Sequence, residues 1–376
     1  MKKIGIITLY SDSCNYGGLL QAYALVDVLN SKGYDAKQIQ VAGVMKALRS
    51  KSILVKIKEK GVRWTLNSLR IRLSTCLQSK KIEEIKLEKV KELCNKFRED
   101  IPHTEYIEIN ALDNLNDEFD LFVVGSDQVW NPKYMLDIFY LTFAKKRKIS
   151  YAASISVYDI TSYSKKKYKD YLRDFGWVSV REEQAVSFLE SEIGIKSDLV
   201  LDPVMLLSKE QWENEEEEIY VRDKYVFCYF LKGNNKKRLF AQKFGQKVGL
   251  KLVYPICVTD TISYDNEKIG EEMLYDVGPR QWLYLLHHAE YVLTDSFHGT
   301  VFSIIFNKQF YHLIRDNKDK YSMNSRILSL LKMFGLERQL GDEVNNFTQI
   351  NYEKINRVLE NKKFESLKLL IDALEK

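Results

Sequence analysis

Short apolar runs alternate along the chain with longer segments in which apolar residues recur at helical spacing. Residues 3–9 form the first run, which is typical of a buried strand. A turn rich in Ser, Asn and Gly follows, and residues 19–34 carry apolar side chains at helical spacing, with Gly33 near the end. The chain is therefore predicted to begin with a strand, a glycine-rich turn and a helix.

The same alternation recurs in two series farther along the chain. The first predicts strands at 36–42, 121–124, 148–156 and 197–203, a helix at 162–175 and a strand-turn-helix unit at 177–195. The second predicts strands at 225–231, 250–256, 291–295 and 309–314 and helices at 234–249, 278–289, 299–307 and 352–375. Strands that alternate with helices form parallel sheets. We therefore predict an α/β fold of two Rossmann-like domains that face each other across a cleft.

Asp202 and Pro203 end the first series, because a proline disfavours a helix at the residue before it. We predict a first domain over 1–206, with a basic helical insertion at about 46–100, and a second domain over 207–345. The helical segment at 346–376 is expected to pack back on the first domain.

The composition is that of a globular protein, with 45% hydrophobic and 29% charged residues and only 5 Pro among 376 residues. No run of 18 uncharged apolar residues is present, so we predict no transmembrane helix. The apolar run 4–9 is too short for a signal peptide, and Asp12 follows it closely. We therefore expect the chain to remain in the cytoplasm.

Cysteine and histidine are too few and too scattered to indicate a metal centre. The 5 His include no HExxH motif, and the 5 Cys form no CxxC pair: Cys14, Cys76, Cys94, Cys228 and Cys257. We expect free thiols in a reducing compartment and predict neither a metal site nor a bound cofactor.

Positive charge is concentrated in one segment. Residues 46–98 contain 16 Lys or Arg and 5 Asp or Glu, a local charge of +11, whereas the whole chain carries +5. Such a segment attracts phosphates, nucleic acid or anionic lipid headgroups, and the alternative is a solvated helical face. No nucleic-acid-binding motif is present, so we expect no nucleic-acid partner and keep peripheral contact with the inner face of a membrane as an open alternative.

Several polar clusters follow predicted strands. In open parallel sheets, ligands bind beyond the carboxyl ends of the strands, so these clusters are candidates for one site. They are Asn15-Tyr16-Gly17-Gly18, Gly125-Ser126-Asp127-Gln128, Arg181, and Asp295-Ser296-Phe297-His298-Gly299. Each cluster alone is a weak signal, and their convergence carries the prediction.

The stretch TDSFHG at 294–299 has the features of an anion site. A helix that begins near Gly299 presents free N–H groups and a dipole that favours an anion. Ser296 can donate to a phosphate, and His298 can donate a hydrogen bond or carry a proton near neutral pH. The alternative is that Ser296 only caps the helix and that His298 is a buried, hydrogen-bonded side chain.

Three further residues have both a functional and a structural interpretation. Arg181 suits a bidentate grip on a carboxylate or phosphate, or a salt bridge to an acid such as Glu182 or Glu183. Asp127 suits a general base, or the cap of a short helix. Trp130 suits stacking on a sugar ring, or a place in the core.

The turn before residue 19 lacks the full GxGxxG pattern, so the sequence gives only weak support for a nicotinamide or ATP site.

The ordered motifs resemble the polysaccharide pyruvyl transferase family. They are CNYGGLLQAYAL, FDLFVVGSDQVWN, SYAASI, VSVRE, LDP and AEYVLTDSFHGTVFSIIF, and the resemblance covers about residues 5–340. It implies a GT-B-like fold and transfer of pyruvate from phosphoenolpyruvate to two hydroxyls of a sugar, giving a ketal and phosphate. The implied acceptor is a sugar of a capsule, exopolysaccharide or cell-wall glycan, often carried on a polyprenyl lipid.

The resemblance implies roles for two residues, and the other candidates come from the residues themselves, most of them in the clusters that follow the strands. Arg181 and His298 match family positions implicated in phosphoenolpyruvate binding and catalysis, and Asp127 is a further catalytic candidate. The substrate-binding candidates are Asn15, Tyr16, Gly17, Gly18, Ser126, Gln128, Trp130, Ser296, Gly299, Thr300 and Arg326. The first domain is the expected acceptor side and the second the expected donor side.

One position departs from the family pattern. Some branches carry an arginine two residues before the histidine, where this chain has Ser296. A donor cation would then come from Arg326, Arg280 or Arg315. Two alternatives stay open: a nucleotide-sugar glycosyltransferase of the same architecture, and a non-catalytic protein of glycan assembly.

Overall fold

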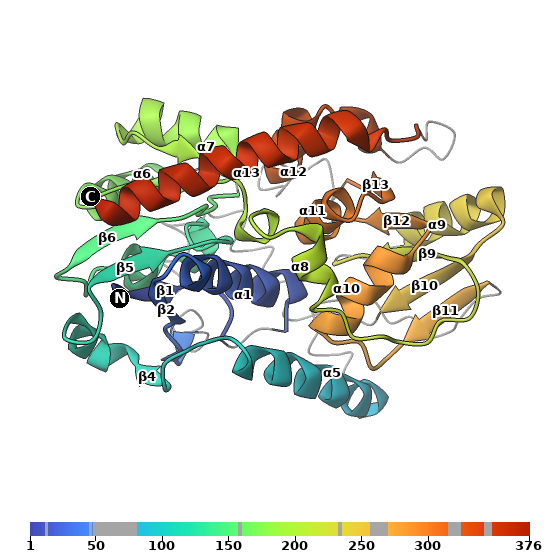
Figure 1. The fold of residues 1–376 in the computed structure, drawn as a ribbon, viewed down its shortest axis with the longest axis horizontal. Helices are drawn as coiled ribbons and strands as arrows, with labels where there is room; N and C mark the ends of the chain where they lie inside the picture. Colours follow the sequence, from blue (N-terminus) through green and yellow to red (C-terminus); the bar gives the residue numbers. More distant parts are fainter. Residues whose placement is uncertain are drawn as a thin grey trace.

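The computed structural model describes residues 1–11, 14–44, 47, 81–156, 160–231, 235–255, 270–314, 325–341 and 348–376. Within these ranges the chain forms two parallel sheets flanked by helices (Figure 1). This agrees with the alternating pattern of the sequence. Most of the basic segment 46–98 lies outside the described residues.

The first sheet has the strand order β2-β1-β5-β6, and every pair is parallel. Bridges from Ile149 to Trp177 and from Ala153 to Val180 extend it toward the parallel pair β7 and β8. The strands span β1 (Lys3–Ile7), β2 (Asp35–Gln38), β5 (Leu121–Val124), β6 (Arg147–Ser150), β7 (Ser179–Val180) and β8 (Asp198–Leu199).

The helices of this half are α1 (Tyr16–Ser31), α5 (Lys81–Glu99), α6 (Ser162–Leu172) and α7 (Glu183–Phe188). The short α8 (Lys209–Glu213) lies in the connection to the second half and packs against α10 (Pro279–His288). The apolar residues of α1 are buried on nearly every side of the helix, with Leu19, Leu25 and Leu29 fully enclosed. A helix that is hydrophobic all round belongs in the interior, which places α1 between the first sheet and the second half of the chain.

The second sheet has the order β11-β10-β9-β12-β13, again entirely parallel. Its strands are β9 (Tyr225–Tyr229), β10 (Lys251–Pro255), β11 (Glu271–Leu274), β12 (Tyr291–Thr294) and β13 (Gln309–His312). Its helices are α9 (Asn235–Val248), α10 (Pro279–His288), α11 (Phe297–Ile305) and α12 (Ser325–Phe334).

Two predicted strands are shorter than expected. The run 36–42 divides into β2 and β3 (Val41–Ala42), because the chain leaves β1 after Gln38 and pairs instead with β4 (Ile107–Glu108). The run 148–156 is a strand only as far as Ser150, since Ala152 and Ser156 adopt positive φ angles of 50° and 63° that break the ladder. The helix predicted to 175 ends at Leu172.

The two halves share one hydrophobic core. Residues of α1, α10 and α11 belong to the same buried cluster, and the Tyr16 hydroxyl donates to the Val277 carbonyl at 2.7 Å. The Tyr16 ring also stacks on Tyr229 of β9, with centroids 6.0 Å apart. The halves are therefore packed against each other rather than only tethered.

Two long helices cross both halves, on opposite sides of the molecule in Figure 1. The last helix, α13 (Tyr352–Glu375), begins beside the second sheet, where the Tyr352 hydroxyl donates to the Ser303 carbonyl at 3.2 Å. Farther along, the Ser366 hydroxyl accepts from the Leu201 amide at 3.0 Å. Helix α5 packs against both α1 and α10.

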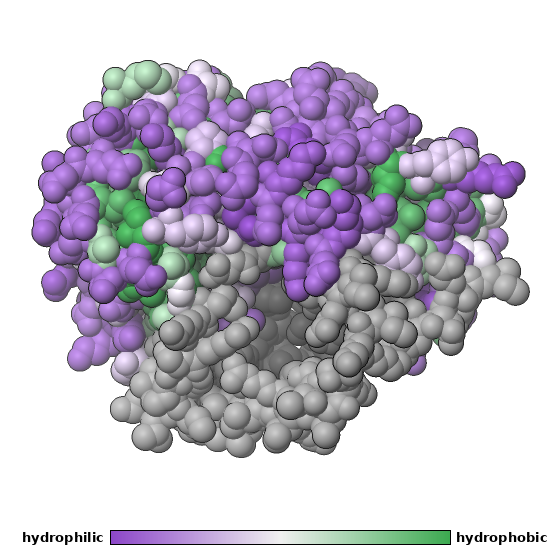
Figure 2. All heavy atoms as spheres, turned by 90° about the horizontal axis from the view of Figure 1, so that it is seen from below, coloured by the Kyte–Doolittle hydropathy of each residue, from purple (hydrophilic) through white to green (hydrophobic). Residues whose placement is uncertain are grey.

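The surface of the described residues is mostly hydrophilic on the face drawn in Figure 2, with small apolar areas between polar side chains. Among the helices that the structure describes, none combines the length and the hydropathy needed to cross a membrane.

Candidate active site

Arg181 lies at the centre of a buried polar cluster between the two halves. It follows β7 and is 4% exposed. Its guanidinium donates to Asp127 Oδ1 at 2.9 Å and forms an ion pair with Asp202. It also donates to the Ser126 hydroxyl at 3.3 Å. The salt-bridge interpretation of Arg181 therefore holds, with Asp127 and Asp202 as the acids in place of Glu182 or Glu183. The ligand-binding interpretation stays open, because an anion could replace one of these carboxylates.

Asp202 is the member of this cluster that the site prediction missed. One of its oxygens accepts from the Val204 amide at 3.2 Å and starts a short 3₁₀ helix. The other faces Arg181, the Ser126 hydroxyl and the His298 ring. Burial alone would raise the pKa of Asp202, but the positive charge of Arg181, with the nearby His298 ring, outweighs burial and holds the pKa well below its usual range. Asp202 therefore stays charged.

His298 brings the second half of the chain into this cluster. It lies in the first turn of α11, is 5% exposed, and its Nε2 is 3.7 Å from Asp202 Oδ2. That distance is too long for a hydrogen bond, and Nε2 has no partner within the described residues. A buried ring nitrogen without a partner is costly in a finished core and is suited to a ligand.

Gly17 explains how His298 fits. A Cβ at position 17 would lie 1.9 Å from His298 Nδ1, far inside van der Waals contact. The glycine-rich turn is thus needed for the imidazole to approach α1. The motifs CNYGG and SFHG, about 280 residues apart in the chain, meet at this contact.

Arg326 supplies a second guanidinium. Its Nη1 is 3.9 Å from Asp127 Oδ1, and its guanidinium carbon lies 5.3 Å from the centre of the Phe297 ring. The Arg181 guanidinium lies 4.4 Å from the same ring. Two arginines therefore flank Phe297, in contact with its π system. Of the two expected donor cations that the structure describes, Arg326 and Arg280, Arg326 lies at the site.

Arg280 does not join the cluster. Arg280 forms ion pairs with Glu215 and Asp100, at the junction of α10 with the connecting segment and α5. Arg315 lies outside the described residues.

The residues around His298 mainly shape the turn before α11. Ser296 caps the helix, with its hydroxyl accepting from the Gly299 amide at 3.3 Å. Thr300 bonds to His312 Nδ1 at 2.8 Å. A Cβ on Gly299 would lie 2.4 Å from Thr294 Oγ1, so this glycine is required for packing inside the fold. The capping interpretation of Ser296 therefore holds in this structure.

Asp295 of the same turn is committed elsewhere. Lys237 Nζ is 2.5 Å from Asp295 Oδ2, and the Leu231 amide donates to Oδ1 at 2.7 Å. This buried ion pair fastens the end of β12 to α9.

The turn after β5 holds Asp127 in place. Gly125 and Asp127 adopt positive φ angles of 118° and 62°. The Ser126 amide donates to Gln21 Oε1 of α1 at 3.1 Å. Gln128 is half-buried, and its side-chain oxygen accepts from Asn131 at 3.3 Å. These bonds fix the Asp127 carboxylate toward Arg181.

Trp130 belongs to the core. Its side chain is fully buried, its Nε1 donates to the Phe139 carbonyl at 2.9 Å, and its ring stacks on Tyr140. The interpretation of Trp130 as a stacking platform for a sugar is wrong for this structure, because neighbouring side chains cover the ring.

The candidate residues of the first glycine-rich turn, 15–18, have mainly structural roles. Asn15 begins α1, where its carbonyl accepts from the Leu19 amide at 3.1 Å. Tyr16 joins the two halves. A Cβ at Gly18 would lie 3.0 Å from the Leu9 carbonyl, so Gly18 packs against the strand. Gly17 of this turn lies against the His298 ring.

The cluster can bind an anion and move a proton. Two guanidinium groups are balanced by two carboxylates, so its charge is near zero when His298 is neutral. An anion would compete with Asp127 and Asp202 for the arginines, whereas His298 retains a free nitrogen.

Comparison with known proteins agrees with the motifs. The family model described as polysaccharide pyruvyl transferase matches residues 15–317. No curated protein matches.

Three solved structures resemble the whole chain in fold. A UDP-GlcNAc 2-epimerase from Methanocaldococcus jannaschii, in complex with UDP-GlcNAc and UDP, has a TM-score of 0.51 and 13% identity over 97% of this chain and 100% of its own. The UDP-GlcNAc 2-epimerase from Neisseria meningitidis has a TM-score of 0.50 and 12% identity over 100% and 99%. An Arabidopsis thaliana protein complexed with UDP-L-rhamnose has a TM-score of 0.50 and 10% identity over 98% of each chain.

These neighbours have the GT-B fold, so they confirm the predicted arrangement of two Rossmann-like units. At such low identity they bear on the fold alone. The family match covers most of the chain, from Asn15 at the start of α1, through Asp127, Arg181 and Asp202, to the SFHG turn. The chain therefore belongs to the polysaccharide pyruvyl transferase family.

Proposed function

We propose that this protein transfers pyruvate from phosphoenolpyruvate to two hydroxyls of a sugar, forming a cyclic ketal and releasing phosphate. The carrying observation is the convergence of Arg181 and Asp127 from one half with His298 and Arg326 from the other. A reaction that joins two substrates suits a site to which each half contributes.

The donor determines which groups are needed. Phosphoenolpyruvate carries a carboxylate and a phosphate, and two guanidinium groups offer charged, planar hydrogen-bond donors for such groups. We assign Arg326 as the donor cation in place of the family arginine that is Ser296 here. The Arg326 guanidinium carbon lies 5.3 Å from the centre of the Phe297 ring and its Nη1 lies 3.9 Å from Asp127, which places this second positive charge beside Arg181.

The reaction moves two protons from the sugar. The donor's C3 gains one proton and becomes a methyl group, which leaves C2 open to attack by the first hydroxyl. Phosphate then departs and the second hydroxyl closes the ketal, so the second sugar proton ends on phosphate. His298 is the proposed proton carrier, because its Nε2 is buried and has no partner among the described residues.

The carboxylates are proposed to orient these groups. Asp202 contacts Arg181 and faces His298, so it can stabilise the protonated imidazole and hold its ring in position. Asp127 is the proposed base for a sugar hydroxyl, after an incoming anion has displaced it from Arg181. We place the acceptor on the side of the first half and the donor on the side of the second.

The acceptor is proposed to be a sugar of a capsular, extracellular or cell-wall glycan precursor, presented at the inner face of the membrane, including a precursor on a polyprenyl lipid. No cofactor is proposed beyond phosphoenolpyruvate as co-substrate.

The test is thermal stabilisation of the purified protein. A ligand at 100 times its Kd adds about 2.7 kcal/mol to the free energy of unfolding. We expect phosphoenolpyruvate to raise Tm, and pyruvate, inorganic phosphate and nucleotide-sugars to have a much smaller effect. Arg326→Gln and His298→Gln should remove the shift, and Arg338→Gln, which lies outside the cluster, should keep it.

Other outcomes overturn the proposal in distinct ways. Stabilisation by a nucleotide-sugar alone would mean that the chain has kept the family fold and changed its donor, as a glycosyltransferase. No stabilisation by any of these ligands would favour a non-catalytic role in glycan assembly.

A further inference from the structure

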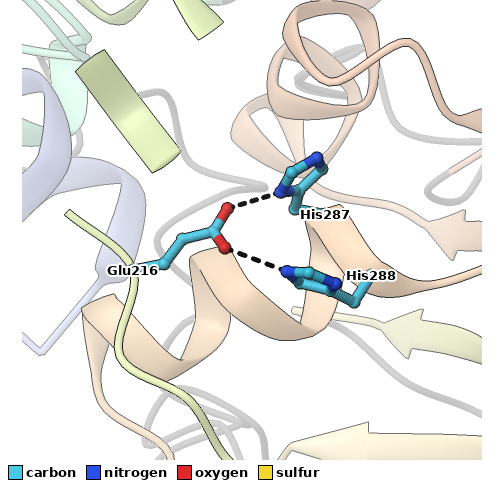
Figure 3. A group of neighbouring side chains, drawn as sticks. All are labelled: Glu216, His287 and His288. Atoms are coloured by element: carbon cyan, nitrogen blue, oxygen red, sulfur yellow. Dashed lines mark hydrogen bonds and ion pairs between the residues drawn. The ribbon is translucent and has the colours of Figure 1, made fainter. Parts of the chain in front are cut away.

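A second cluster of polar side chains lies away from the candidate active site. Glu216 and two adjacent histidines, His287 and His288, point toward one another (Figure 3). His287 Nδ1 is 2.7 Å from Glu216 Oε1, and His288 Nε2 is 3.2 Å from Glu216 Oε2. The histidines are the last two residues of α10, and Glu216 lies in the segment that joins α8 to β9.

The geometry at His287 has a chemical consequence. Its Nδ1 faces Glu216, and its Nε2 is 3.4 Å from Glu213 Oε1. Carboxylates only accept when ionised, so both ring nitrogens would have to carry protons to satisfy both neighbours. A cation between Nδ1 and Glu216 would satisfy both of these atoms while the ring is neutral. The single ring proton would then be on Nε2 and would point at Glu213.

We propose that Glu216, His287 and His288 bind a divalent transition-metal ion, with Zn²⁺ as the best-fitting example. Two imidazole nitrogens and a carboxylate oxygen are ligands that this class of ion prefers. The three ligand atoms lie within 4.8 Å of one another. An ion about 2.1 Å from each requires separations of no more than about 4.2 Å, so small side-chain rotations suffice.

The surroundings of the two rings support a ligand role. Glu213 would orient His287 in the way that carboxylates commonly orient metal-bound imidazoles. The His287 ring stacks on Phe306 with centroids 4.5 Å apart, and the His288 ring stacks on Tyr284 at 4.1 Å. Both rings are therefore held in position before any ion arrives, which lowers the entropy cost of binding.

The site would fasten the connection between the halves. The acidic run 215–218 lies beside α10 in space. Glu215 pairs with Arg280, and the Glu217 amide donates to the Arg280 carbonyl at 3.3 Å. Phe306 follows the last residue of α11, whereas His298 lies at its start, so the helix separates the two clusters by about 12 Å along its axis. The ion would thus be structural, and the proposal does not depend on the proposed reaction.

The experiment is a Zn²⁺ titration of the full-length, untagged, chelator-treated protein by isothermal calorimetry. We expect one ion per chain and release of protons, seen as a heat that depends on the ionisation enthalpy of the buffer. Glu216→Gln and His288→Ala should each weaken binding at least about tenfold. Co²⁺ should give a visible absorption band in the wild type that the same variants lose.

Controls separate this site from general surface binding. Glu218→Gln changes an exposed carboxylate of the same acidic run and should bind Zn²⁺ as the wild type does. His288 is 47% exposed, so its truncation leaves the core intact, and circular dichroism would check the fold. The proposal is wrong if the wild type shows no saturable binding at micromolar Zn²⁺, or if Glu216→Gln and His288→Ala bind as tightly as Glu218→Gln.

Discussion

Gly17 and His298 are in such close contact that a single methyl group between them would occupy the space of the imidazole. A Cβ at position 17 would lie 1.9 Å from His298 Nδ1. This contact joins the start of α1 in the first half to the start of α11 in the second. His298 can therefore occupy its observed position only because residue 17 is a glycine.

Gly17→Ala should therefore displace His298. We expect a loss of stability of about 1–3 kcal/mol from overpacking, together with loss of any activity that depends on the histidine. Urea unfolding measures the first effect. The double variant Gly17→Ala/His298→Ala should regain stability relative to the single variant, because the clashing ring is gone. Simple addition of the two single effects would show that the contact is absent.

Arg181 should be important for the fold as well as for activity. Its guanidinium is paired with Asp127 and Asp202, both buried, so Arg181→Ala would remove the closest counter-charge of two carboxylates and leave Asp127 only its 3.9 Å contact with Arg326 among the described arginines. We expect a destabilisation of about 3–5 kcal/mol, measured by urea unfolding. Arg173→Ala, at an exposed arginine that pairs with its neighbour Asp174, should cost far less. A fully stable Arg181→Ala variant would contradict the observed pairing.

Asp202 should contribute to stability in a pH-dependent way. Its pKa is depressed in the folded chain, so the contribution is present above the unfolded pKa of about 3.9 and is lost as pH falls toward the folded value. The free energy of unfolding of the wild type should therefore fall more steeply below about pH 4 than that of Asp202→Asn. Equal slopes in acid-range urea titrations would show that Asp202 is not held by Arg181.

Cys14, the first residue of the CNYGG motif, should be a reactive thiol. A hydrogen bond from Cys94 is the main cause that lowers its pKa to about 7, burial opposes it, and the positive charges of Arg98 and Lys91 assist. Mass spectrometry after iodoacetamide treatment should show labelling at Cys14 with a half-maximal rate near that pH. Cys228 is buried and its pKa is raised, so it should remain unlabelled and serves as the internal control.

The basic segment 46–98 should bind anionic vesicles if the acceptor is lipid-linked. Its excess of 16 basic over 5 acidic residues would attract the headgroups, and 0.5 M salt should weaken the attraction because the Debye length falls to only a few ångströms, about 3–5 Å. Sedimentation with vesicles measures this, with neutral vesicles for comparison. Replacing Lys56, Lys58 and Lys60 by Gln should reduce binding, and the same change at Lys165, Lys166 and Lys167 should not.

The hydrophobic pattern predicted most of the elements and the class of fold. Buried strands such as β5, β9 and β12 appear as compact apolar runs, and α13 matches its predicted span of 352–375. Errors occurred where a local pattern did not reveal a change of partner, as at the division of β2 from β3. A ladder ends when its neighbour changes, and the neighbour is remote in sequence.

The candidate site could be predicted in part for a related reason. Asp127, Arg181 and His298 follow strands of parallel sheets, and the carboxyl ends of such strands lie at one edge. The sequence marks Asp202 as the end of a domain, and the signal for a site residue is that this acid closely follows a strand. The metal-ligand cluster gave no signal of that kind, because Glu216 and His287 are 71 residues apart.

The sequence by itself determined the alternation of strands and helices, the family, and the residue types available for chemistry, because periodicity and motif order are properties of the chain alone. Only the tertiary structure decided that Trp130 is core, that Ser296 is a cap, that Arg326 joins Arg181 across Phe297, and that Gly17 makes room for His298. Those outcomes depend on how the two halves pack, and a buried contact between segments hundreds of residues apart leaves no pattern in either segment.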